Sequence, residues 1–271
     1  MRNHTRCGED GSMKFDPSIG VIPVRQPLGF RYEAGVFGPD PERRSLDAIR
    51  RSLRDPDCSG PDPVYAIVMD VGRAEIRDQL NERMLLFGAV IYASGQLGTE
   101  PVRSQGHMHH VSSHSGWSPP EIYEIWEGSA YVYMQEFVAD NPGRCYAIVA
   151  KPGDKVVVPP AWAHAAISRN ASDFMALGAL CDREYSFDYD AVRKRNGLAW
   201  YPMVTRDGNI EWVPNARYEK TVLEVRPPRE YRELGVVQKD SLYKQAARHL
   251  DRFAWVSKPG ICEEAWKLFE P

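Results

Sequence analysis

The histidines of this chain are concentrated in one short stretch. Four of the seven fall within eight residues: His107, His109, His110 and His114. On a β-strand, side chains two residues apart point to the same face, so His107 and His109 can reach one metal ion. Glu121 opens a later β-rich run, and His164 follows a Pro-Pro corner. Three imidazoles and one carboxylate suit Fe, Mn, Ni or Zn, and the pattern predicts one divalent metal per chain.

Neighbouring side chains are alternative candidates for the metal site or for the pocket around it. His110 alternates away from the predicted site if the strand persists, which favours a solvent-facing role over ligation. Glu124 lies three residues after Glu121, so we expect it on the opposite side of the strand, as a surface residue. His114 and Trp117 lie in the loop between His109 and Glu121. For His114, a lid over the pocket and simple exposure are both open; Trp117 could roof the pocket or stack on a sugar.

Three segments carry a resemblance to a known family. They read GHMH at 106–109, EIYEIWEG at 121–128 and PGDKVVVPPAWAH at 152–164. They resemble the two motifs of the cupin superfamily, whose fold is a small antiparallel jelly-roll barrel. The match is closer still to the cupin-type, archaeal-like glucose-6-phosphate isomerases, and it covers about 60–218. The resemblance implies a metal-dependent aldose–ketose isomerase acting on a sugar phosphate.

The resemblance also implies roles for individual residues. The implied metal ligands are His107, His109, Glu121 and His164. The implied substrate-binding positions are Tyr65, Ser104, Gly106 and Tyr189. Glu121 and Tyr123 are the implied catalytic pair, with Glu121 moving a proton between the first two carbons of the sugar.

Three departures from the family pattern bear on the substrate. The loop between His109 and Glu121 is about five residues longer than the pattern predicts. Ala89 stands where the pattern has a phosphate-contacting threonine, and Phe187 where it has a histidine two residues before Tyr189. The ligand set is kept, but the substrate side has fewer polar groups. The alternatives are therefore a metal cupin of different activity (another isomerase, an epimerase or an Fe/Mn dioxygenase) and a non-catalytic cupin that binds a small ligand.

The elements that must position these residues are mostly strands. Short β-rich runs separated by turn-forming residues lie at 64–69, 84–92, 122–126, 130–137, 146–150, 155–158 and 174–181. A hairpin is predicted over 201–205 and 210–213, around an Asp-Gly-Asn turn. This spacing is typical of an antiparallel sandwich or barrel. The predicted fold class is an all-β cupin jelly roll with an N-terminal helix and a C-terminal helical extension.

The two ends of the chain differ from this middle. We expect a flexible segment at 1 to about 20 and a helix at about 41–54, capped by Asp40 with Pro41 at its first position. Arg43-Arg44 and Arg50-Arg51 indicate a solvated face of this helix, and a contribution to phosphate binding is the alternative. After 219, helices are predicted from Asp240 or Ser241 onward and at 262–269, with His249 packed on the first. The predicted domains are 1–58, 59–218 (the barrel) and 219–271.

Composition excludes several classes of protein. The 271 residues carry a formal net charge of −3, which argues against binding driven by nucleic-acid phosphates. No apolar run reaches the length of a membrane-spanning helix, and the opening residues lack the apolar core of a secretory signal. Five widely spaced cysteines without a CxxC pair indicate reduced thiols. We therefore expect a cytoplasmic protein. The resemblance to cupins implies a homodimer whose partner is a small sugar phosphate or related polyol.

Overall fold

The computed structural model describes residues 15–271. Most of the segment predicted to be flexible, 1 to about 20, lies outside these residues. At its described end, Ile19 is fully buried in the apolar core beside β1, so the chain is already packed there.

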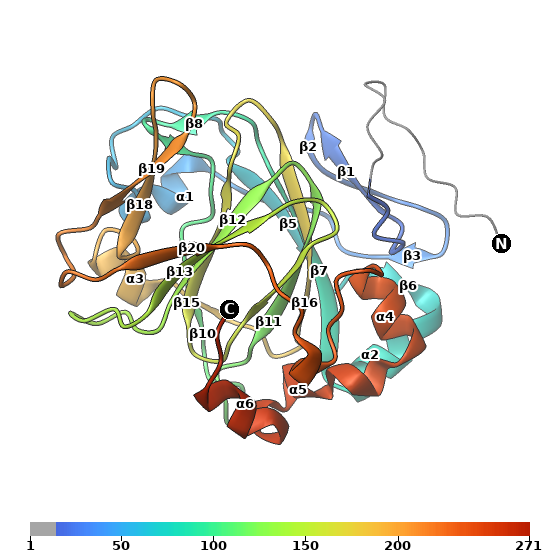
Figure 1. Cartoon of the computed structure of the whole chain (residues 1–271). Coiled ribbons are helices and arrows are strands. Elements are labelled where there is room, and N and C mark those ends of the chain that lie inside the picture. The colour runs from blue at the N-terminus through green and yellow to red at the C-terminus, as the bar shows by residue number, and fades with distance from the viewer. Residues whose placement is uncertain (1–14) are drawn as a thin grey trace.

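Two sheets form the body of the molecule (Figure 1). The larger has the order β14-β11-β16-β7-β5-β4, and the smaller has the order β15-β12-β13-β20. The larger sheet contains β4 (Glu42–Arg44), β5 (Tyr65–Met69), β7 (Leu85–Tyr92), β11 (Glu121–Glu127), β14 (Lys155–Val158) and β16 (Met175–Asp182). The smaller contains β12 (Ala130–Gln135), β13 (Cys145–Ala150), β15 (Ala163–Ser168) and β20 (Leu223–Arg226). All pairings are antiparallel except β13 with β20, and the predicted jelly-roll class is confirmed.

Shorter elements surround the sheets. Five two-stranded pairs are formed by β1 (Val21–Arg25) with β2 (Leu28–Tyr32), β3 (Val36–Phe37) with β6 (Gly72–Arg73), β8 (Gln96–Leu97) with β9 (Glu100–Pro101), β10 (Met108–His109) with β17 (Phe187–Asp188), and β18 (Trp200–Val204) with β19 (Ile210–Pro214). The helices are α1 (Leu46–Ile49), α2 (Arg77–Glu82), α3 (Asp190–Lys194), α4 (Leu242–Arg248), α5 (Ala254–Ser257) and α6 (Glu263–Lys267). None of the helices in 15–271 is long and apolar enough to cross a membrane.

Alternation along the strands builds the core. In β12, Ala130, Val132 and Met134 point between the two sheets, and Tyr131 and Tyr133 point to the outer face. The outer face of the smaller sheet is covered by residues of 192–218, and that of the larger sheet by the β1–β2 hairpin and the C-terminal helices. Figure 1 shows α4, α5 and α6 together on one side of the strands, next to α2. Both sheets are therefore shielded on their outer faces.

The predicted helix at 41–54 is wrong in its first half. Residues Glu42–Arg44 form the edge strand β4, whose Arg44 pairs with Tyr65 of β5. The helix α1 begins only at Leu46, and Ser45 caps it by accepting the N–H of Ala48 at 3.3 Å, in place of the predicted Asp40. The local cap signal was outweighed by backbone pairing with the open edge of β5, which sequence spacing does not reveal.

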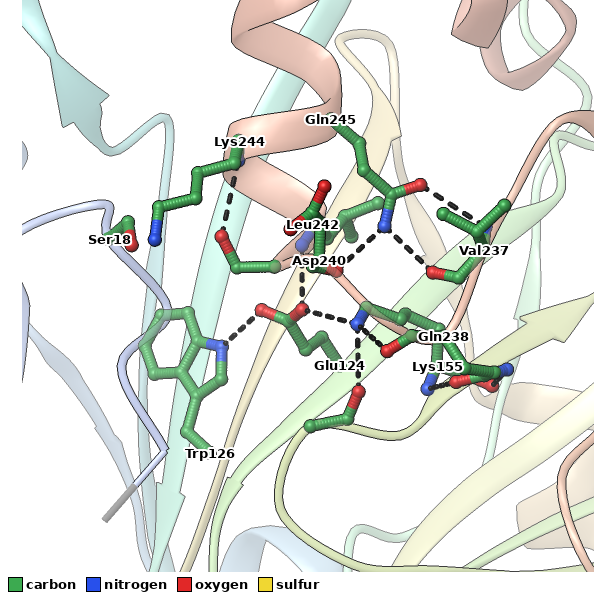
Figure 2. A network of polar contacts seen from close by, with 12 residues as sticks. Ser18, Glu124, Trp126, Lys155, Val237, Gln238, Asp240, Leu242, Lys244 and Gln245 are labelled. Carbon is green, nitrogen blue, oxygen red and sulfur yellow. Dashed lines mark hydrogen bonds and ion pairs between the residues drawn. The ribbon is translucent and has the colours of Figure 1, made fainter. Parts of the chain in front are cut away.

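The prediction that Glu124 is a surface residue is also wrong. Glu124 lies on the opposite side of β11 from Glu121, as expected, but only 2% of its surface is exposed. Figure 2 shows the cause: the C-terminal extension covers this face, and the Glu124 carboxylate meets Lys155 Nζ at 3.3 Å and the N–H of Leu242 at 2.6 Å. Trp126 donates to its other oxygen. A residue predicted at the surface is therefore part of a buried polar network.

The C-terminal helices begin where the sequence predicts them. Ser241 caps α4 by accepting the N–H of Lys244, and α6 lies within the predicted 262–269. His249 is exposed, contrary to the packing role predicted for it, because α4 ends at Arg248 and the chain turns there. Two strands outside the predicted barrel range of 59–218, β4 and β20, belong to the sheets.

Candidate metal centre

The first two histidines lie at β10, in a segment that runs beside β15. The N–H of His107 donates to the carbonyl of His164 at 3.1 Å, and the N–H of His164 donates back to His107 at 2.9 Å. This reciprocal pair aligns the two residues across the strands. Gly106 precedes them with φ +83°, a left-handed conformation that glycine adopts without strain. The turn at Gly106 thus directs both histidines of the HxH pair toward β15.

The carboxylate comes from the other sheet. Glu121 is the first residue of β11 and pairs with Val158 of β14. Its Oε2 lies 3.2 Å from His164 Nε2 and 3.4 Å from His109 Nε2. One ligand atom from each of His107, His109, Glu121 and His164 falls within 4.8 Å of all the others, and all four residues are buried. The four predicted ligands therefore converge on one point between the sheets.

Backbone carbonyls orient two of the imidazoles. His109 Nδ1 lies 2.9 Å from the Pro119 carbonyl, and His164 Nδ1 lies 3.0 Å from the Trp162 carbonyl. In a neutral ring Nδ1–H donates to the carbonyl, which leaves the Nε2 lone pair directed at the centre. His107 Nε2 and His109 Nε2 are buried without a hydrogen-bond partner. Unpartnered buried nitrogens beside a carboxylate are what a divalent ion would satisfy, so these residues fit a metal.

The charges within the cluster suit the same role. Burial lowers the pKa of His107 well below its usual value, and His164 and His109 add to the effect. Burial would raise the pKa of Glu121, but the neighbouring His109 and His164 hold it well below the usual range. The cluster therefore offers a neutral imidazole and an ionised carboxylate, the protonation states in which these groups bind metal.

A cavity opens from the cluster across the inner face of the larger sheet. Tyr65, Ser104, Tyr123 and Tyr189, all predicted from the sequence, line it together with His107 and Glu121. Its remaining walls are Arg44, Ile67, Met69, Gly88, Ala89, Val90, Tyr92, Leu177, Ala179 and Phe187. Gly106 is not among the lining residues and serves the turn described above. The cavity thus joins the ligand cluster to a mixed wall of hydroxyl groups and apolar side chains.

Comparison with known proteins shows which family this chain belongs to. A sequence model described as "Glucose-6-phosphate isomerase (GPI)" matches residues 47–220. The chain belongs to the glucose-6-phosphate isomerase family. The isomerase assignment expected from the motifs is thereby confirmed.

Curated members of the glucose-6-phosphate isomerase family are similar over most of their length. The enzyme of Thermococcus gammatolerans is 26% identical over 211 residues, which cover 76% of this chain and 95% of the relative. That of Pyrococcus horikoshii is 25% identical over 203 residues, with 72% and 98% covered. A solved structure of oxalate oxidase, 17% identical, covers 46% of this chain and 54% of its own with a TM-score of 0.32, an overlap too limited to bear on function.

Of the two substitutions relative to the glucose-6-phosphate isomerase pattern, only Phe187 directs its side chain at the cavity. Phe187 lies in β17 opposite His109. Ala89 borders the cavity, but its side chain packs with Val68, Phe87 and Ile91 on the outer face of the larger sheet, so a side chain at this position would not reach the substrate. The Phe187 ring stands 4.6 Å from the His107 ring, centroid to centroid, in an edge-on arrangement. An apolar ring therefore contacts the ligand cluster on the cavity side.

The long loop lies away from the cavity. Glu184 Oε2 accepts hydrogen bonds from Ser112, Ser113 and the N–H of His114. His114 is exposed, and Trp117 is half-buried near Gly260. Neither side chain lines the cavity, and His110 is exposed as predicted.

Two residues of the site escaped the sequence analysis. Arg44 lines the cavity from β4, although it was expected on a solvated helix face. Cys181 in β16 donates its thiol hydrogen to Glu121 Oε1 at 3.0 Å. Neither belongs to a motif, and both reach the site through pairing between strands distant in sequence. The Arg-Arg pair at 43–44, noted as an alternative for phosphate binding, was the one available signal.

Proposed function

We propose that this chain is a metal-dependent aldose–ketose isomerase of a sugar phosphate, of the glucose-6-phosphate/fructose-6-phosphate type. The observation that carries the proposal is the buried cluster of His107, His109, Glu121 and His164 at one end of a cavity, in a chain of the glucose-6-phosphate isomerase family. One divalent ion, Fe, Mn, Ni or Zn, would be held by these four residues. Such an ion supplies Lewis acidity toward the oxygens on the first two carbons of the sugar.

Glu121 is the proposed proton carrier. Its carboxylate is ionised and sits at the cavity end, so it can accept the proton from the second carbon and return it to the first, through an enediol. The hydroxyl proton on the second oxygen moves to the first oxygen, which completes the exchange of aldose for ketose. A hydride shift between the two carbons is the alternative chemistry. Incorporation of solvent deuterium at the second carbon during turnover supports the enediol route, and its absence argues against it.

Tyr123 is the proposed second catalytic group. It follows Glu121 by two residues on β11 and lines the same cavity. Burial raises the pKa of its phenol well above the usual value, so the hydroxyl keeps its proton. It can therefore donate a hydrogen bond to a substrate oxygen. We assign Tyr65, Ser104 and Tyr189 to contacts with the rest of the sugar phosphate.

Metal analysis followed by turnover on a panel of sugar phosphates tests the proposal. We expect about one divalent ion per chain and interconversion of glucose 6-phosphate and fructose 6-phosphate. His164→Ala removes a ligand from β15 and should abolish metal loading and activity together. A metal-loaded protein without isomerase activity on the panel would refute the proposed reaction, and metal retained by His164→Ala would refute the ligand set.

A metal cupin of different activity is the second candidate. Ile67, Met69, Val90, Leu177 and Phe187 make much of the cavity wall apolar, which favours a less polar substrate. The same panel, extended to epimerase and dioxygenase substrates, separates the two candidates.

We also propose that the protein acts in the cytoplasm as a homodimer. Free thiols at Cys58, Cys145, Cys181 and Cys262 accord with a reducing compartment. Gel filtration at two protein concentrations tests the dimer, which a constant monomeric mass would exclude.

A further inference from the structure

Arg44 gives the cavity a positive charge. Of the described residues that line it, Arg44 alone carries a permanent cation, and it lies outside the residues 47–220 that match the family. In the antiparallel pairing of β4 with β5, Arg44 stands directly opposite Tyr65. Cross-strand partners share a face of the sheet, so the side chain is directed to the cavity side.

The charges are arranged at opposite sides of the larger sheet. Glu121 lies on β11 and Arg44 on the edge strand β4, with β16, β7 and β5 between them. Each intervening strand contributes to the cavity wall, for example Ala179, Val90 and Tyr65. The guanidinium thus lies across the sheet from the His107/His109/Glu121/His164 cluster. A substrate whose anionic tail binds at Arg44 can therefore extend its other end toward that cluster.

The guanidinium is available to a ligand. Its Nε atom is buried without a hydrogen-bond partner, and its two terminal nitrogens contact Glu42 at 3.0 and 3.2 Å. The Glu42 side chain is 62% exposed, so solvent screens its charge. A phosphate dianion can bind the guanidinium with the same two-pronged geometry and carries more negative charge than the carboxylate. A phosphate can therefore compete with Glu42 for Arg44.

We propose that Arg44 binds the phosphate of the substrate and sets the preference for phosphorylated over unphosphorylated sugars. The inference rests on the proposed function for its substrate class. The charge of Arg44 also reaches Tyr65 and Tyr189, where it opposes the rise in phenol pKa that burial causes.

Binding of fructose 6-phosphate and of fructose to the metal-loaded protein tests this role. The two ligands differ only in the phosphate, so the ratio of their Kd values isolates its recognition. We expect Arg44→Gln to reduce the preference for fructose 6-phosphate by about 10- to 100-fold, with unchanged metal content. Arg44→Lys should fall between, and Glu42→Gln should strengthen binding of the phosphorylated sugar by about two- to fivefold. Arg51→Gln, which removes an exposed arginine that does not line the cavity, is the matched control.

The outcomes separate this inference from the proposed reaction. A preference unchanged in Arg44→Gln, or abolished equally in Arg51→Gln, overturns the role of Arg44 even if the wild type isomerises glucose 6-phosphate. A preference that depends on Arg44 in a protein without isomerase activity supports the phosphate site and overturns the reaction. A wild type that binds both sugars equally overturns the phosphate role of Arg44, whatever its isomerase activity.

Discussion

The two oxygens of Glu121 have different partners. Oε2 faces His109 and His164, and Oε1 accepts the thiol hydrogen of Cys181. Burial, with Glu121 adding to it, raises the pKa of Cys181 well above the usual value, so the thiol stays a donor. Groups that hydrogen-bond a metal ligand fix its orientation and tune its affinity. Cys181 is therefore a positioning residue for the carboxylate.

Substitution of Cys181 tests this positioning. Cys181→Ala leaves Oε1 without its donor, and we expect metal affinity to fall by about tenfold or more. Cys181→Ser keeps a hydroxyl donor and should retain most of the affinity. Isothermal titration calorimetry with the metal found in the native protein measures the metal affinity of both variants. Cys58→Ala, a buried thiol outside the cavity lining, is the control, and wild-type affinity in Cys181→Ala would contradict the role.

Residue type and spacing predicted which four side chains converge in the buried cluster, but not what surrounds them. His107, His109, Glu121 and His164 could be selected because imidazoles and a carboxylate at strand spacing have few other uses. Arg44 and Cys181 could not, because arginine and cysteine occur throughout the chain. Their roles arise only when β4 pairs with β5 and β16 with β11, and such pairings leave no local trace.

At the scale of elements, a buried ion pair joins the C-terminal extension to the sheet. Lys155 Nζ contacts Glu124 and donates to the carbonyls of Gly153 and Gln238, and Glu124 accepts the N–H of Leu242 at the start of α4 (Figure 2). Burial raises the pKa of Glu124 to about 7, against the opposing effect of Lys155. Burial also lowers the pKa of Lys155. The pair therefore makes the attachment of α4 depend on pH.

The buried Glu124 carboxylate should make the free energy of unfolding depend on pH in a definite direction. The pKa of Glu124 is higher in the folded protein than its ordinary value of 4.5, so the folded state binds the proton more tightly and stability falls as pH rises between these values. We expect the free energy of unfolding of the wild type, relative to Glu124→Gln, to fall by about 2 to 3 kcal/mol from pH 5 to pH 8. Urea unfolding at several pH values measures it.

The exposed substitution Glu219→Gln serves as control and should leave the wild-type pH profile unchanged. Parallel profiles for the wild type and Glu124→Gln would show that the buried carboxylate does not titrate in this range.

Strands with a clear apolar pattern in the sequence were predicted correctly. Strands that form only because neighbouring strands pair with them were not predicted. The strands at 84–92 and 174–181 are apolar runs bounded by turns, and they form β7 and β16. Residues 163–168 contain His164 and alanines, without a β-branched run, and their strand β15 was missed. Residues 41–44 carry helix-start signals but complete the sheet edge. In both cases neighbouring strands determine the conformation.

At the scale of the molecule, the proposed metal would link the two sheets. Glu121 belongs to the larger sheet and His164 to the smaller, with His107 hydrogen-bonded beside it. Because the ligands converge only in the folded state, metal binding should stabilise that state. Removal of the metal by a chelator should lower Tm by about 5 to 10 °C.

Differential scanning calorimetry of His164→Ala provides the comparison, since its Tm should not respond to the chelator. An equal Tm for the wild type with and without chelator would argue against a metal linking the sheets.

The order of strands in the larger sheet has a consequence for folding. Strand β7 pairs with β16, so Leu85 lies beside Asp182, and β11 lies on the far side of β16. Pairing across so long a stretch of chain is slow, because closing the loop costs entropy before the strands meet. On a growing chain, Glu121 cannot reach its final position until β16 has been synthesised. The ligand cluster should thus be among the last parts of the molecule to assemble, and metal uptake should follow the slowest folding step.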